Sequence, residues 1–100
     1  MQVNEVTLTG ELTAVEPLRY TPAGIPLSAF RLLHRSQQVE AGVTRQVECE
    51  LPGVALAQVA LAMAGFSAGR SVTVRGFLNR KNRMSAQPVL HATSMEPAKE

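Results

Sequence analysis

Residues 6–14 read VTLTGELTA, and their alternation decides how the rest of the chain is interpreted. Apolar side chains occupy the even positions on either side of Gly10, whereas threonine or glutamate occupies each odd position. This period of two predicts a long strand with one buried face. Because Gly10 stands on that face, we expect a bend or bulge there. A long, bent first strand is typical of a small closed β-barrel.

Two more strands are predicted before the middle of the chain. Residues 17–26 are rich in proline and end the first strand in a turn. The second strand is predicted over 25–36, and because its apolar face changes sides we expect a bulge near Ser28–Ala29. Residues 40–42 form the next turn, after which alternation over 43–51 predicts the third strand.

The second half of the chain predicts a helix followed by two strands. Residues 52–65, PGVALAQVALAMAG, have a helical composition, with a proline at the start and a glycine at the end. Strands are predicted over 71–78 and 88–95 and are joined by a polar loop over 79–87. The residues after 95 are expected to fray.

The order of elements is therefore three strands, a helix and two strands. That order predicts an all-β fold, a five-stranded OB-fold Greek-key barrel with a short helix or an irregular connection between strands 3 and 4. We expect a single OB-fold domain over residues 1–100, with its core at about 4–95 and a short frayed C-terminus.

Composition excludes several classes of protein. With 45% hydrophobic and 18% charged residues the chain is not a disordered tail. No apolar run approaches the ~20 residues of a membrane helix, and the first twelve residues lack the basic flank of a signal peptide. The single cysteine, Cys49, excludes an internal disulfide and a cysteine zinc cluster. We expect a cytoplasmic domain without a metal or other cofactor.

Positive charge is concentrated in the second half of the chain. All eight acidic residues are glutamates, and residues 51–95 contain five cations and none of these acids. Such segregation favours a polyanionic partner. Three of the five cations, Arg80, Lys81 and Arg83, fall in the polar loop before the last strand, and Arg75 precedes them. We expect these side chains to contact phosphates, the alternative being a solvated hairpin tip.

A second group of cations lies on the second and third strands. Arg31 and Arg35 share one face of the second strand, and Arg45 lies on the third. These arginines are interpreted either as a basic floor for a nucleic acid or as partners of Glu48 and Glu50 across the strands. Both interpretations can hold together.

Aromatic rings and catalytic groups are few. Tyr20 in the first loop and Phe77 on the fourth strand could stack on bases, and Phe30 is expected in the core. The chain has no aspartate, and His34 and His91 are isolated in strands, so the histidines are structural residues or weak phosphate contacts. The sequence does not favour an enzyme.

Four stretches carry a resemblance to a known family. They are GIPLSAFRLLHRS over 24–36, EAGVTRQ over 40–46, GRSVTVRGFLNRKN over 69–82 and VLHA over 89–92. Together they resemble the family of bacterial primosomal replication protein N, or PriB. NEVTLTGEL over 4–12 and PLRYTPAGIP over 17–26 are also similar to the wider bacterial single-stranded DNA-binding protein family, to which PriB is related.

The resemblance implies a homodimeric OB-fold that binds single-stranded DNA in replication restart. It implies PriA helicase as a partner at stalled forks, with DnaT and single-stranded DNA-binding protein as further partners, in the bacterial cytoplasm. The family binds DNA through the strand 2–3 face and the loop between strands 4 and 5. The nucleic-acid-binding residues expected from the sequence and the resemblance are Arg35, Arg45, Arg75, Arg80, Lys81, Arg83, Tyr20 and His34.

One departure from the family keeps an alternative open. Family members can carry aromatic residues on and beside strand 3, where this chain has Val43 and Glu48. An outward Glu48 would repel phosphate, so we expect weaker DNA binding than in an aromatic-bearing relative. The alternative function is a protein-interaction module that stimulates or recruits a helicase and binds DNA weakly.

Overall fold

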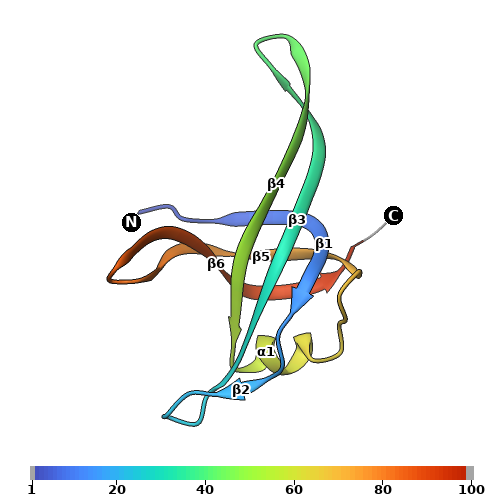
Figure 1. Cartoon of the computed structure of the whole chain (residues 1–100). Coiled ribbons are helices and arrows are strands. Elements are labelled where there is room, and N and C mark those ends of the chain that lie inside the picture. The colour runs from blue at the N-terminus through green and yellow to red at the C-terminus, as the bar shows by residue number, and fades with distance from the viewer. Residues whose placement is uncertain (1, 99–100) are drawn as a thin grey trace.

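The computed structural model describes residues 2–98 and forms a closed β-barrel (Figure 1). Neighbouring strands follow the order β1-β5-β6-β4-β3-β2, and a further pairing between β1 and β3 closes the barrel. The elements are β1 (Val6–Val15), β2 (Arg19–Tyr20), β3 (Pro26–Glu40), β4 (Val43–Leu56), α1 (Gln58–Met63), β5 (Ser71–Asn82) and β6 (Ser85–Pro97). Five strands and one short helix confirm the predicted barrel, to which the two-residue β2 is added.

The core lies inside the barrel and extends to α1, which covers one end (Figure 1). Ala60 and Met63 of α1 are fully buried and pack with side chains from the strands. Each fully buried large apolar side chain contributes about 1.5–3 kcal/mol relative to an exposed one. The largest of them are Leu12, Leu32, Met63, Leu90, Val72 and Val74.

Strand β1 pairs with two partners in succession. Its first half pairs with β5 from Val6 to Glu11, and its second half pairs with β3 from Glu11 onward. The irregularity lies between Leu12 and Ala14, so the bulge predicted at Gly10 was placed too early. At Gly10 the β3 backbone comes so close that a Cβ atom would collide with it. The glycine marks a close approach, which sequence alone cannot distinguish from a bulge.

The bulge predicted near Ser28–Ala29 was wrong. Between Leu27 and Glu40 every residue of β3 pairs in unbroken register with β4. Ser28 takes an inward position and is buried, and its hydroxyl donates a hydrogen bond of 2.9 Å to the Glu16 carbonyl. In the sequence, the polar Ser28 on the core face interrupts the apolar alternation and so resembles a change of register.

The helix is shorter than predicted. Residues 52–56 continue β4, and Gly53 to Ala55 pair in parallel with Leu90 to Ala92 of β6. Gly53 lies against the ring of Phe30, where a Cβ atom would collide with the ring. The alanine-rich sequence suits a helix, but the parallel pairing and the ring contact favour the strand, since tertiary packing overrides propensity.

The polar loop predicted over 79–87 is mostly a hairpin. Strand β5 reaches Asn82 and β6 begins at Ser85, so Arg80 and Lys81 lie on a strand and Arg83 in the turn. Because both faces of this hairpin are exposed, its sequence lacks the alternation that reveals a strand. Strand β6 also continues through Pro97, which pairs with Val72, so 96–97 are ordered in the sheet. Residues 99–100 of the expected frayed end lie outside the described residues.

The ends of β3 and β4 project beyond the barrel as a long hairpin (Figure 1). We call residues 36–47 the arm. Ala41 and Gly42 form its tip with positive φ angles of 52° and 75°. Two consecutive left-handed residues match the twist of the flanking strands, which fixes the register of the arm.

Candidate nucleic-acid interface

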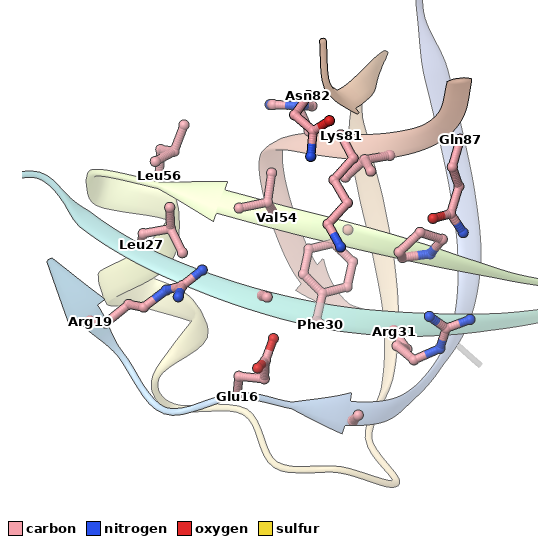
Figure 2. Close-up of a pocket in the computed structure, with 16 residues that line it drawn as sticks. Glu16, Arg19, Leu27, Phe30, Arg31, Val54, Leu56, Lys81, Asn82 and Gln87 are labelled. Atoms are coloured by element: carbon pink, nitrogen blue, oxygen red, sulfur yellow. The ribbon is translucent and has the colours of Figure 1, made fainter. Parts of the chain in front are cut away.

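A groove of about 580 Å³ lies on the outer face of β3 and β4, between β2 and the β5–β6 hairpin (Figure 2). Its floor is small and apolar and includes Leu27, Ala29 and Val54. Ala29 has a short side chain that leaves space above the floor. The Phe30 ring beneath the floor is 2% exposed and packs inward against Gly53, so it does not fill the groove. The groove can therefore accept flat apolar groups such as nucleobases.

Three cations surround the groove, each from a different strand. Arg19 comes from β2, Arg31 from β3 and Lys81 from β5, and Figure 2 shows the three around Val54. Glu16 is the acidic residue in the lining. An apolar floor with cations at its rim suits a polymer that carries both bases and phosphates.

The arginines of β3 and β4 are paired with glutamates. Arg31 Nε lies 2.7 Å from Glu50 Oε1, and Arg35 Nε lies 2.9 Å from Glu48 Oε2. The hydrogen bond from Arg31, and then one from Thr13, lowers the pKa of Glu50 below its ordinary value. The hydrogen bond with Glu48 raises the pKa of Arg35. The cross-strand pairing considered from the sequence is thus present for both arginines.

Arg45 is paired as well, on the arm. Its Nε lies 2.9 Å from Glu40 Oε1, near the tip and away from the groove lining. Arg35 and Arg45 are exposed, but each carries an acidic neighbour that a phosphate would have to displace.

The cations of the β5–β6 hairpin differ from Arg35 and Arg45. Among residues 2–98, no carboxylate lies within ion-pair distance of Arg75, Arg80, Lys81 or Arg83. Of these four, Lys81 lines the groove. Four cations without a carboxylate partner among residues 2–98 thus lie on β5 and the turn after it, and Arg19 of β2 is another, on the opposite side of the groove.

The two ring residues of the predicted binding set, Tyr20 and His34, occupy different settings. Tyr20 is 62% exposed and lies beside Arg19 on β2. Both ring nitrogens of His34 are bound, Nδ1 to the Thr9 carbonyl at 2.7 Å and Nε2 to the Ser36 hydroxyl at 2.8 Å. Because a carbonyl oxygen can only accept, Nδ1 carries the proton, and the ring of His34 joins β1 to β3.

Two groove residues were not predicted from the sequence. Arg19 and His91 both contribute to the lining. Arg19 sits next to Tyr20 in the first loop, and a cation beside an exposed ring could have drawn attention to it. His91, isolated in its strand, was interpreted as a structural residue or a weak phosphate contact and was not placed among the predicted DNA-binding residues.

The described residues hold no cluster suited to a metal. Within residues 2–98, no three histidine, cysteine or acidic side chains come together in a way that could hold an ion. Over the same range, no helix has the length and apolar character needed to cross a membrane.

Residues 4–94 match the model of a family described as "another single-strand binding protein family". The chain is also 41% identical, over 88% of its length and 82% of the relative's, to replication restart protein PriB of Nitrosomonas europaea. The chain belongs to the PriB family. A PriB structure from Ralstonia solanacearum superposes with a TM-score of 0.89 at 30% identity, covering 98% of this chain and all of that one.

The fold of the PriB family extends to other DNA-binding proteins. The single-stranded DNA-binding protein of Thermus aquaticus superposes with a TM-score of 0.77 at 26% identity, covering 97% of this chain and 50% of that chain. The predicted OB-fold and the predicted PriB membership are both confirmed.

Proposed function

We propose that this protein binds single-stranded DNA and acts as an accessory factor in replication restart. The observation that carries the proposal is the groove, whose apolar floor lies between Arg19 of β2 and Lys81 of β5, two cations that form no ion pair within residues 2–98. Membership of the PriB family, whose curated members are named replication restart proteins, supports the same function.

Affinity would come mainly from phosphates. Lys81 contacts the DNA backbone from inside the groove. Further phosphates are contacted by Arg75 and Arg80 of β5 and by Arg83 in the turn after it. Cations bind phosphates without regard to sequence, because counterion release supplies the free energy. The bases lie over the apolar floor, and Tyr20 on β2 offers a further exposed ring outside the groove, next to Arg19. Arg35, Arg45 and His34 contribute less, because each is already bound to a protein group.

The wider role that we propose is the one that the family resemblance implies. The protein works with PriA helicase at stalled forks in the bacterial cytoplasm, and DnaT and single-stranded DNA-binding protein are further partners. It acts as a homodimer and does not itself catalyse a reaction.

Fluorescence anisotropy of a labelled single-stranded oligonucleotide, measured at several salt concentrations, tests the proposal. For the variant Arg80→Ala/Lys81→Ala/Arg83→Ala we expect weaker binding. The plot of the logarithm of the binding constant against the logarithm of the salt concentration should have a slope that is shallower by about 2, at about 0.7 for each of the three lost phosphate contacts. Arg70→Ala is the control for lost net charge, since Arg70 packs on the Phe66 ring away from the groove lining. Absence of wild-type binding at low salt would contradict the proposal.

The arm supports the alternative function. Its arginine is neutralised, and Val39 and Val43 are exposed near its tip. If DNA binding is absent, the arm becomes the candidate surface for a protein partner. PriA helicase would then be titrated against the unlabelled protein, with Val39→Ser/Val43→Ser as the variant.

A further inference from the structure

Two rings stack at the edge of the groove. Phe77 of β5 and His91 of β6 stand opposite each other in the ladder, with ring centroids 5.1 Å apart and planes inclined by 11°. Such offset stacking stabilises the pair beyond the area that it buries. The imidazole ring is therefore held in a fixed orientation by its neighbour.

The two rings of this stack differ in position. His91 lines the groove, whereas Phe77 is absent from its lining. On the side away from Phe77, the neighbour of His91 is Val54 of β4, which belongs to the groove floor. Phe77 thus stacks on one face of the imidazole, and His91, with Val54 on its other side, is the ring of the pair that borders the groove.

The remaining rings of the described chain do not offer this arrangement. Phe30 lines the groove but is almost fully buried, and Phe66 is covered by the guanidinium of Arg70. His34 has both nitrogens engaged and is absent from the lining. Tyr20 is exposed on β2, outside this groove.

We propose that His91 is a base-stacking residue, which binds a nucleobase as the third ring of a stack backed by Phe77. This inference rests on the proposed function and names the part of the DNA that the site takes. The apolar floor at Val54 lies beneath the base, and Lys81 at the rim receives an adjacent phosphate, whereas Arg31 at the rim is already paired with Glu50. Every base has a flat face, so the subsite tolerates any sequence.

The main test uses His91→Ala and His91→Phe in the same anisotropy assay. We expect His91→Ala to weaken binding about tenfold, within the range found for one stacked base, without changing the salt slope. His91→Phe keeps a flat ring and should retain most of the affinity. Equal affinity for His91→Ala and wild type, or an equal loss in both variants, would overturn the proposal.

A second measurement uses the wild-type protein and avoids any effect of the variants on folding. The chain contains two histidines, so their imidazole proton signals can be assigned with a single His34→Gln variant. Adding a short oligothymidylate should shift the His91 signal upfield, and an abasic oligonucleotide of the same length should leave it unchanged. A His91 signal that does not move on saturation with oligothymidylate rules out stacking.

The two proposals fail in different ways. Suppose that the wild type binds DNA with a steep salt dependence, that the His91 proton signal does not shift and that His91→Ala binds as tightly as wild type. The stacking site is then wrong and the proposed function stands. If the wild type does not bind at low salt, the proposed function itself is wrong.

Discussion

Arg35 and Glu48 stand directly opposite each other on β3 and β4, and Arg35 Nε lies 2.9 Å from a Glu48 carboxylate oxygen. Both side chains are well exposed, and exposed ion pairs add little to stability. The main consequence of the pair is electrostatic. Glu48 neutralises a cation on the face where the family resemblance implies DNA contact, and a phosphate can reach Arg35 only in competition with this carboxylate.

Replacing Glu48 should therefore tighten DNA binding in two separable ways. Glu48→Gln releases Arg35 without adding a ring, and we expect an affinity gain of a few fold that disappears at high salt. Glu48→Trp also adds a stacking surface, worth about 1–3 kcal/mol for one base, and this gain should persist at high salt. The two variants are compared by anisotropy at low and high salt. Unchanged or weaker binding by Glu48→Trp would argue against a DNA path over this face.

Arg19 should matter more than Arg35 for DNA binding. Arg19 lines the groove and has no acidic partner among the described residues, whereas Arg35 is held by Glu48. We expect Arg19→Ala to reduce the log–log salt slope by about 0.7, the value for one phosphate contact on a single strand. Arg35→Ala should reduce the slope by less. The reverse order would place the DNA over the Arg35–Glu48 pair on β3 and β4 and not in the groove.

Gly53 should tolerate no side chain. A Cβ atom there would collide with the Phe30 ring, which cannot move because it is buried in the barrel. We expect Gly53→Ala to lower the free energy of unfolding by about 1–3 kcal/mol, as overpacked cores do. Gly65→Ala is the matched control, because its Cβ would make an ordinary contact of 3.6 Å. Urea denaturation measures both variants, and equal midpoints would show that the ring is free to move.

Stability should depend on the ionisation of Glu50. The pKa of Glu50 is lowered by the hydrogen bond from Arg31 and then by that from Thr13. Its contribution is therefore present above the ordinary glutamate pKa and is lost as the pH falls through the lowered value. We expect wild type to exceed Glu50→Gln slightly in urea midpoint at pH 7, with the difference vanishing in acid. A difference that grows on acidification would contradict this assignment.

The sequence predicts the barrel well where one face of a strand is buried. The alternation around Gly10 identifies β1, and the order of elements identifies the OB-fold. The prediction fails where packing decides the local structure. Residues 52–56 have a helical composition but continue β4. Within them Gly53 to Ala55 pair in parallel with β6, with residues almost forty positions away, and no local pattern reveals such a pairing.

The site is predicted less completely than the fold. Arg80, Lys81 and Arg83 stand out because they are clustered in the sequence, and the structure leaves them without carboxylate partners among residues 2–98. Arg19 and His91 are not part of a cluster of cations in the sequence, and the fold of the chain brings them to the groove. Whether an arginine is paired also depends on strand register, as with Arg45 and Glu40.

The two-partner role of β1 has a consequence for synthesis of the protein on the ribosome. The N-terminal strand needs β3 for its second half and β5 for its first, and β6 must then join β4 to β5. Because the chain emerges from its N-terminus, the barrel cannot close until nearly the last strand is outside the exit tunnel. Until then Leu12 and Leu32 cannot be enclosed on all sides, so the hydrophobic core is completed only after β6 has emerged.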